Sequence, residues 1–457
     1  MTETLSKARE ILLRYSLCGR CLGRLLAYDK TGTRAPEAGE EIMAKLLREA
    51  LALLNHSRES AVALIKALSE SGYRPAQKIA EEQGLRVEAR ICPVCLGRLT
   101  DGVIDEVVAE SVKRVSDYEF EDFLVGAYIP KYIASVEERL FSEFGLAESE
   151  TLRKEITREV GSRLEALLGK PANFTSPEML ILVDIFTGTV EAKPASLYIY
   201  GHYFKNQPNI PQTPWYCSTC WGAGCERCAG LGRIYPDSVA EYVGEPAMRM
   251  AGAIGYKFHA AGREDVDVTV EGTGRPFILE LIMPRRRRIP LETLKEDIER
   301  NSRGRVKVDM LDYATHSDLK MLKVSIEGSV KRYSAIVQFE RNVSIEDLAS
   351  LETALRGAVI EQYTPTRVLK RKGEKIRKKR VLNIKSTLID THTVRFEIEA
   401  DGGLYVKELI HGDAGRTRPS VAEILGNTPT NISLRFLGIL KTLHHPKQPT
   451  SNHARPK

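Results

Sequence analysis

The sequence has no long hydrophobic run. No stretch approaches the roughly 18 uninterrupted apolar residues that a membrane-spanning helix needs, and the first 19 residues, MTETLSKAREILLRYSLCG, lack the apolar core of a signal peptide. Apolar residues nevertheless make up 42% of the 457 residues and charged residues 28%, so the chain can bury a core and is not compositionally disordered. We therefore expect a soluble, cytoplasmic protein of two or three domains.

Several catalytic signatures are also missing. There is no GxxxxGK[ST] phosphate loop and no GxGxxG segment that opens a βαβ unit. The HExxH, GxSxG and protein-kinase signatures are absent as well. These absences disfavour nucleotide hydrolysis and nicotinamide redox chemistry.

Positive charge is concentrated in the second half of the chain. The net charge is +6, yet residues 361–380 (EQYTPTRVLKRKGEKIRKKR) hold nine Lys and Arg against two Glu, so the remaining residues sum to −1. Four further arginines stand in a row from Arg285 to Arg288. A focused cationic segment on a near-neutral body favours binding of a polyanion such as nucleic acid, although an isolated basic run is often only a solvated loop.

All eight cysteines fall in four CxxC pairs: Cys18/Cys21, Cys92/Cys95, Cys217/Cys220 and Cys225/Cys228. Two CxxC turns, each presenting two thiolates, complete a tetrahedral zinc site. The last two pairs lie together in CSTCWGAGCERCAGLG and can close as a zinc ribbon, while the first two, 71 residues apart, would clamp N-terminal helices to a later strand. We predict two structural zinc sites of four cysteines each. An iron–sulfur cluster uses the same ligands, and a redox CxxC is the third alternative.

Hydrophobic spacing divides the chain into a helical, cysteine-bearing first part and a second part of mixed helices and strands. The first part is predicted to hold helices over 1–15, 37–54, 59–72 and 149–168, and strands over 87–91, 178–187 and 193–200. The second is predicted to hold strands around 266–270, 277–281, 324–326 and 394–398, and helices over 291–300 and 345–359. We therefore expect an accessory region over 1–235, an α+β catalytic domain over 236–443 and a frayed, flexible tail over 444–457.

A pair of carboxylates in AGREDVDVTV is the strongest candidate for chemistry. Strand alternation would place Asp265 and Asp267 on one face and Val266 and Val268 on the other, with Arg263 beside Asp265. An arginine near a carboxylate keeps it ionised and orients it, as a nucleophile or electrostatic stabiliser requires. From this segment alone, an edge strand with solvated aspartates explains the pattern equally well.

Three short segments together resemble pseudouridine synthases. Arg263–Asp265 is similar to the Arg-x-Asp element that carries the catalytic aspartate of these enzymes. Lys331–Ala335 (KRYSA) is similar to their basic-Tyr-Ser-Ala element, and Gly403–Lys407 (GLYVK) to their Gly-x-Tyr-hydrophobic-basic element. Their order and their spread over roughly 145 residues also match.

The resemblance narrows to one family, the archaeal and eukaryotic tRNA pseudouridine synthase that acts in the TΨC arm and carries a THUMP-containing accessory domain. The segments that carry it are AGREDVDV, GTGRPFILEL, TPTRVLKRKGEKIRKKR and GLYVKELIHGDAGRTRPS, together with the N-terminal cysteine pairs and the junction GHYFKNQPNIPQTPWYCSTCWGAGC. Thr269 departs from the family, which usually has a basic residue there. This departure weakens the match of this strand to the family and does not affect the assignment of Asp265.

The resemblance implies an α+β fold in which a pseudouridine synthase domain with a mixed, largely antiparallel sheet follows a zinc-bound, THUMP-like accessory domain. It implies isomerisation of uridine to pseudouridine at positions 54 and 55 of the tRNA TΨC loop, without a catalytic cofactor, by a protein that we expect to be a monomer. The target nucleotide would flip out of its stack to be reached.

The resemblance also implies roles for single residues. Asp265 would be the essential carboxylate, as a nucleophile or as the base that starts glycal formation, with Asp267 as its rival. Arg263 and Lys407 would hold the aspartate charged, Tyr333 would stack on the uracil, and Tyr405 would line the pocket. The basic run 367–380 would be a flexible loop that binds the tRNA backbone through Arg367, Lys370, Arg371 and Lys372.

Three other functions fit parts of the sequence. CSTCWGAGCERCAGLG contains two CxxCxGxG units as in the zinc domain of J-proteins, but those proteins carry four units and a His-Pro-Asp motif, which is missing here. Another THUMP-bearing tRNA enzyme, such as a methyltransferase or a thiolation enzyme, would need a methyl-donor or ATP site, and no glycine-rich signature for either is present. A THUMP-containing tRNA-binding protein without isomerase activity is the third.

Overall fold

A computed structural model describes residues 2–26, 34–146, 149–325, 328–369 and 373–441. The chain forms two compact units, Met1–Ala195 and Ser196–Lys457. Within the described ranges, no helix is both long enough and apolar enough to cross a membrane. The tail expected over 444–457 lies outside the described residues.

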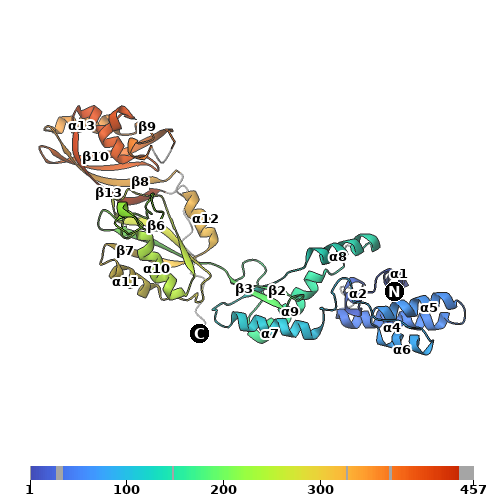
Figure 1. Ribbon diagram of the computed structural model, residues 1–457. Helices are drawn as coiled ribbons and strands as arrows, with labels where there is room; N and C mark the ends of the chain where they lie inside the picture. Colours follow the sequence, from blue (N-terminus) through green and yellow to red (C-terminus); the bar gives the residue numbers. More distant parts are fainter. Residues whose placement is uncertain (1, 27–33, 147–148, 326–327, 370–372, 442–457) are drawn as a thin grey trace, which may run out of the picture. The chain divides into compact units, whose positions relative to one another are not determined.

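The first part of unit 1 is a group of helices around the first cysteine pair (Figure 1). They are α1 (Thr2–Arg14), α2 (Gly19–Leu26), α4 (Ala35–Leu53), α5 (Arg58–Glu70) and α6 (Arg74–Glu82), which confirms the helices predicted over 1–15, 37–54 and 59–72. Helices α2 and α4 approach closely because glycines meet at their contact: a Cβ on Gly39 would lie 1.8 Å from the Gly19 carbonyl oxygen. This approach leaves no room for any larger residue there.

The second part of unit 1 packs two helices on a small sheet. Helices α7 (Asp101–Val115) and α9 (Leu152–Leu168) contact the strands β1 (Phe123–Ala127), β2 (Met179–Asp184) and β3 (Thr189–Pro194), and α8 (Lys131–Phe144) follows β1 along the chain. Strand β2 lies in the centre, parallel to β1 and antiparallel to β3. The predicted helix over 149–168 and strand over 178–187 are confirmed. The strand predicted over 87–91 is wrong: this segment is irregular and pairs with no strand of the described chain.

Unit 2 is built on a ten-stranded mixed sheet. The strand order is β12 (Thr417–Arg418), β9 (Val359–Tyr363), β10 (Ile376–Asp390), β11 (Thr393–Asp401), β8 (Val330–Phe339), β13 (Pro429–Lys441), β6 (Thr269–Ile282), β4 (Leu197–Lys205) and β7 (Val306–Ala314), with β5 (Gly255–Ala260) paired to β6. All pairings are antiparallel except that of β13 with β6. This topology confirms the predicted mixed, largely antiparallel sheet.

Helices cover the sheet of unit 2 and close its core. Helix α10 (Val239–Ala251) packs on β5 and β6, α11 (Leu291–Asn301) on β7, and α13 (Ile345–Leu355) on β10. The helices predicted over 291–300 and 345–359 are thus confirmed. The strand predicted around 324–326 is wrong at Val324, which belongs to α12 (His316–Ser325), whose Leu319 and Leu322 are buried at helical spacing. Ile326 lies outside the described residues.

The division between the units falls before the boundary expected at 235. Strand β4 is hydrogen-bonded to β6 and β7, so the large sheet already includes Leu197. The segment 193–200, expected as one strand, comprises the end of β3 and the start of β4, which belong to different sheets. The second cysteine cluster, at 217–228, therefore belongs to unit 2.

Candidate active site and metal centres

Asp265 lies in a loop between β5 and β6, not in a strand as expected. Strand β6 begins only at Thr269, and the Val268 amide donates to the Asp265 carbonyl oxygen at 3.1 Å, which closes a turn. Asp265 and Asp267 are therefore not alternate residues of a pleated strand. The Asp265 side chain is 37% exposed, so it is open to a substrate.

Buried side chains from the segment before the second cysteine cluster form hydrogen bonds to the backbone of the loop that carries Asp265. The ammonium of Lys205, at the end of β4, is fully buried and donates to the carbonyl oxygens of Asp265 at 3.3 Å, Val266 at 2.9 Å and Ile210 at 3.0 Å. Gln212 donates to the Gly262 carbonyl oxygen at 2.9 Å. Burial lowers the pKa of Lys205 to about 8.

A second buried group anchors the residue before Asp265. The Glu264 carboxylate accepts from the Tyr203 hydroxyl at 2.7 Å and pairs with the Arg275 guanidinium at 2.9 Å, and all three side chains are almost inaccessible to water. Arg275 also donates to the Ala261 carbonyl oxygen at 2.8 Å. Because buried charges persist only when they are paired and hydrogen-bonded, Glu264 fixes the backbone that presents Asp265.

Arg367, predicted to bind the RNA backbone, contacts Asp265 instead. Its Nη1 lies 2.7 Å from Asp265 Oδ1, and its Nε lies 2.7 Å from Oε1 of Glu408 on α14 (Val406–His411). Glu408 is 1% exposed, so a buried carboxylate holds one side of the guanidinium while the other side faces Asp265. Desolvation opposes the charge of Arg367, but the two carboxylates outweigh it and raise the pKa of its guanidinium.

The two cations expected at Asp265 lie elsewhere. Lys407 forms an ion pair with Asp267. Burial alone would raise the pKa of Asp267, but the pairing with Lys407 outweighs it and leaves the pKa below its usual value. Arg263 is exposed and lies over the Trp215 indole, 5.2 Å from the ring centroid. Arg367 thus pairs with Asp265 and Lys407 with Asp267, while Arg263 contacts Trp215.

The two predicted tyrosines lie on separate elements around this loop. Tyr333 on β8 is half-buried, with its ring edge-on to Phe436 at 5.6 Å, and its electrostatic neighbours include Asp265. Burial raises the pKa of its hydroxyl. Tyr405 precedes α14, and the fully buried Gln362 side chain bonds both its amide and its carbonyl at 2.9 Å. Its ring lies 6.0 Å from the guanidinium carbon of Arg367. The site therefore joins an oriented carboxylate to two aromatic rings.

The basic segment 367–380 is only partly a loop. Residues from Ile376 onward form β10, which pairs with β9, so the expectation of one flexible loop is wrong for this part. Lys370, Arg371 and Lys372 lie outside the described residues.

The cysteines gather in the two predicted clusters. The sulfur atoms of Cys18, Cys21, Cys92 and Cys95 lie within 4.8 Å of one another, and so do those of Cys217, Cys220, Cys225 and Cys228. Four ligands at about 2.3 Å from a tetrahedral zinc ion would be about 3.8 Å apart, and the Sγ–Sγ separations include 3.6 Å for Cys18–Cys95 and 3.7 Å for Cys220–Cys228. The donor sets fit a single four-coordinate ion. Cys92 and Cys95 stand in a turn and not at a strand, which corrects the expected clamp.

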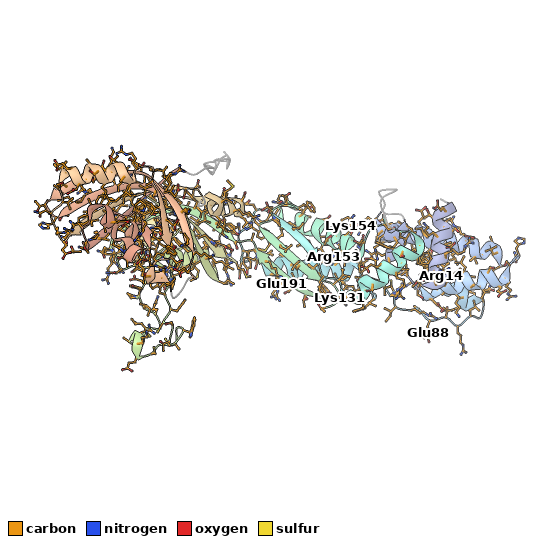
Figure 2. All side chains as sticks on the ribbon, turned by 90° about the horizontal axis from the view of Figure 1, so that it is seen from above. Arg14, Glu88, Lys131, Arg153, Lys154 and Glu191 are labelled. Atoms are coloured by element: carbon orange, nitrogen blue, oxygen red, sulfur yellow. The ribbon has the colours of Figure 1, made fainter. Side chains whose placement is uncertain are left out.

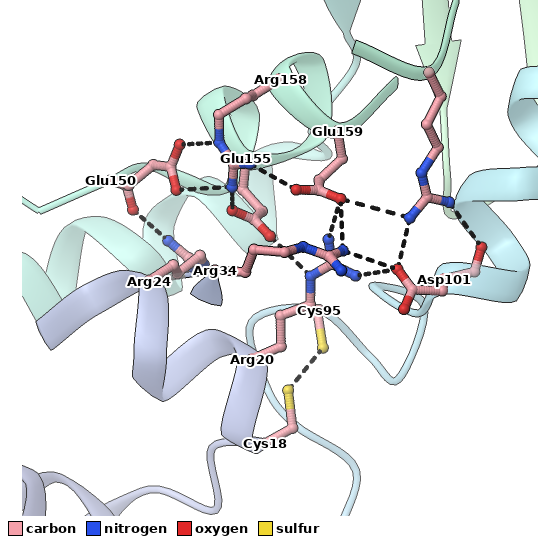
Figure 3. A network of polar contacts seen from close by, with 11 residues as sticks. Cys18, Arg20, Arg24, Arg34, Cys95, Asp101, Glu150, Glu155, Arg158 and Glu159 are labelled. Carbon is pink, nitrogen blue, oxygen red and sulfur yellow. Dashed lines mark hydrogen bonds and ion pairs between the residues drawn. The ribbon is translucent and has the colours of Figure 1, made fainter. Parts of the chain in front are cut away.

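A buried ionic network lies next to the first cluster (Figure 3). Arg20, on the same helix as Cys21, pairs with Glu155 at 2.8 Å and with Glu159 at 3.2 Å, both on α9. Arg24, one turn after Cys21, pairs with Glu137 on α8 at 2.7 Å and donates to the Glu150 carbonyl oxygen. The helix that carries Cys21 is thereby tied to the second part of unit 1.

Residues 198–439 match the family model "Pus10, C-terminal", and residues 107–184 match "Pus10 THUMP domain, archaeal". A tRNA pseudouridine synthase Pus10 of Thermofilum pendens is 38% identical over 440 residues, which are 96% of each chain. The chain belongs to the Pus10 family. Another relative of that name, from Methanopyrus kandleri, is 38% identical over 92% of this chain and 95% of its own. Membership in Pus10 confirms the pseudouridine synthase fold, the THUMP domain and the isomerase class.

Similarity to solved structures is slight. A chain in "Crystal Structure of a Cbf5-Nop10-Gar1 Complex" is 13% identical, with 52% of this chain and 58% of that chain covered and a TM-score of 0.28.

Five residues of the site escaped prediction: Lys205, Gln212, Glu264, Arg275 and Glu408. Their positions carried a signal, because each lies in a segment that resembles the family. Their burial was not visible, since an isolated Lys, Glu or Arg in a sequence is usually a solvated residue.

Proposed function

We propose that this Pus10 protein converts uridine to pseudouridine at positions 54 and 55 in the TΨC loop of tRNA, and that Asp265 is its catalytic carboxylate. One observation carries the proposal: in a chain of this family, Asp265 projects from a firmly anchored loop and meets Arg367. The THUMP match in unit 1 supports tRNA as the substrate.

The reaction needs no redox partner. The N1–C1′ bond of the flipped uridine breaks, the base turns, a C5–C1′ bond forms, the proton on C5 leaves and N1 gains one. Asp265 acts as the nucleophile or as the base that starts glycal formation, and the ion pair with Arg367 orients its carboxylate. Tyr333 stacks on the uracil, and Tyr405 lines the pocket and contacts the base. Lys407 acts on the site indirectly, because its ion pair orients Asp267.

The phosphates of the tRNA are bound by basic side chains in both units. In unit 1, Lys131 begins α8, while Arg153 and Lys154 lie in the first turn of α9, all three exposed (Figure 2). In unit 2, Lys370, Arg371 and Lys372 and the basic start of β10 serve the same purpose. Such contacts set position more than sequence choice, so selection of the TΨC arm comes from tRNA shape. The protein acts on tRNA as a monomer.

Each cysteine cluster holds one structural zinc ion. The sulfur spacing supports one ion per cluster, and four thiolates leave no open position for a substrate. The metal would tie α2 to the turn at Cys92–Cys95 in unit 1, and would close the segment 217–228 in unit 2.

The test is pseudouridine mapping by carbodiimide-dependent primer extension on an unmodified tRNA transcript. Wild-type protein should produce stops at positions 54 and 55, and Asp265→Asn should produce none while it still binds the transcript. Asp267→Asn tests the rival carboxylate: it leaves the Asp265–Arg367 contact in place, so stops should still form, and their complete loss would assign the essential role to Asp267. No stops with folded wild-type protein that binds tRNA would favour a binding protein without isomerase activity.

A further inference from the structure

The second cysteine cluster carries an exposed aromatic patch that metal binding does not explain. Trp221 is 83% exposed and Tyr216 65%, and both belong to the short segment around Cys217–Cys228. Gly222, the residue after Trp221, lies beside the Tyr216 ring. Trp221 is one of only two tryptophans in the chain. Large exposed apolar side chains on one small module usually mark an interaction surface.

The backbone of the cysteine turns directs this position outward. Leu96, Trp221 and Ala229 each follow the second cysteine of a CxxC pair, and all three have a positive φ, near 50°. All three are also exposed. The turn therefore requires a left-handed backbone conformation at the residue after the second cysteine. It does not require a large side chain there, because Ala229 occupies the same position. The indole of Trp221 contributes nothing to the sulfur cluster that an alanine would not.

The base of this module is attached to the candidate catalytic loop. The Ile234 amide donates to the Trp215 carbonyl oxygen at 2.8 Å, and Tyr216 pairs with Arg233 in an antiparallel bridge. Trp215 in turn contacts Arg263, two residues before Asp265. The module is thus linked through Trp215 to the loop of Asp265, and the exposed Arg227 provides a cation for an RNA backbone.

We propose that Trp221 and Tyr216 form a stacking platform for an unpaired base of the substrate RNA. The inference rests on the proposed function, because it assumes that RNA is bound at Asp265. Aromatic faces accept any base by stacking, and an adjacent arginine adds a phosphate contact, which is how sequence-tolerant single-strand sites are built. The platform would hold the RNA at a second point while one nucleotide is flipped.

Intrinsic fluorescence tests the contact directly. The variant Trp215→Phe leaves Trp221 as the only tryptophan and keeps a ring beside Arg263. Titration with an unmodified tRNA transcript should quench its emission, because the indole stacks on a base. A blunt RNA duplex of the same length offers phosphates without unpaired bases and should not quench it. Unchanged emission while tRNA binds would overturn the proposal, and so would quenching that depends on protein concentration alone, which would assign the patch to a second copy of the chain.

Affinity provides the second readout. Trp221→Ala should weaken tRNA binding by roughly tenfold, a loss in the range of one base stack, while Trp221→Phe should stay within about threefold of wild type. Leu231→Ala removes an exposed side chain of the same module that cannot stack, and should bind as wild type does. Zinc content shows whether each variant keeps its cysteine cluster. If wild type forms pseudouridine and Trp221→Ala binds normally, the platform is refuted and the proposed function stands; if wild type forms none, the proposed function fails and the quenching still decides the platform.

Discussion

The contact between Arg367 and two carboxylates makes a testable prediction about catalysis and stability together. Arg367→Met removes the partner of Glu408, which is 1% exposed, and leaves its carboxylate buried without a counter-charge. Breaking a buried pair costs about 3–5 kcal/mol. Arg367 itself is 37% exposed, so water reaches the pair and we expect about 2 kcal/mol of local destabilisation.

The same substitution also removes the charged donor that aims Asp265. A charge-assisted hydrogen bond is worth about 1.5–3 kcal/mol, which predicts a roughly 10- to 150-fold slower isomerisation step. Single-turnover release of tritium from tRNA labelled at uracil C5 measures this step, and hydrogen exchange at the amides of α14 measures the local stability.

A double variant separates the two effects. Arg367→Met with Glu408→Met leaves no buried charge and should recover most of the lost stability, because apolar pairs often replace buried ion pairs without cost. It should stay as slow as the single variant, because Asp265 still lacks its donor. Normal catalysis in Arg367→Met, or no recovery of exchange protection in the double variant, would refute the reasoning.

Four further predictions concern other parts of the molecule. Lys205→Met removes the buried ammonium that donates to the carbonyl oxygens of Ile210, Asp265 and Val266, and leaves the last two with only a backbone amide donor. The isomerisation rate should therefore fall at least tenfold while tRNA affinity in filter binding changes little; a loss confined to affinity would contradict this. Cys95→Ser should lose one zinc ion per chain in metal analysis and weaken the protection of α2 from hydrogen exchange, because metal binding contributes to folding; full zinc content would contradict it. Burial raises the pKa of Glu150 to about 7 from an ordinary 4.5, so between these pH values the folded chain binds more protons than the unfolded chain. The free energy of unfolding of unit 1 should therefore fall by about 1–2 kcal/mol from pH 5 to pH 8. In thermal unfolding, Glu150→Gln should reduce this pH dependence, and an unchanged pH dependence would exclude Glu150 as its source. Replacement of Lys370, Arg371 and Lys372 by alanine should reduce the salt slope of tRNA binding by about 2–3, at about 0.7–0.9 for each lost phosphate contact; an unchanged slope would show that they do not touch the backbone.

Local patterns in the sequence predicted much of the fold. Apolar spacing placed α9, β2, α11 and α13, because an element that packs on a core must repeat its apolar residues with its own period. The cysteine pairs predicted their own clusters, since a CxxC turn brings two thiolates together within four residues and only a short segment separates the third pair from the fourth.

Alternation of polar and apolar residues predicted a strand at Asp265, where the structure has a loop. Asp265 and Asp267 alternate with valines, but the carbonyl oxygens of Asp265 and Val266 accept from the Lys205 side chain and from the amides of Val268 and Asn209, and not from the backbone of a neighbouring strand. Val324 failed in a similar way, because helical burial of Leu319 and Leu322 outweighed a short apolar alternation. In both cases the deciding contact was with a segment far away in the sequence: Lys205 holds the loop of Asp265, and α12 packs on β6.

The identity of the chemical groups is thus a property of the sequence: the carboxylates, the two tyrosines, the eight thiols and the cationic segment can be read from it without coordinates. Which cation meets which carboxylate was decided only by the tertiary structure. Arg367 stands 102 residues after Asp265 and reaches it from the segment after β9, while Lys407 from α14 meets Asp267. Electrostatic attraction depends on distance in space and not on separation in the sequence. Which cation pairs with which carboxylate therefore depends on which loops the strand order brings to the same edge of the sheet. No local period encodes that order.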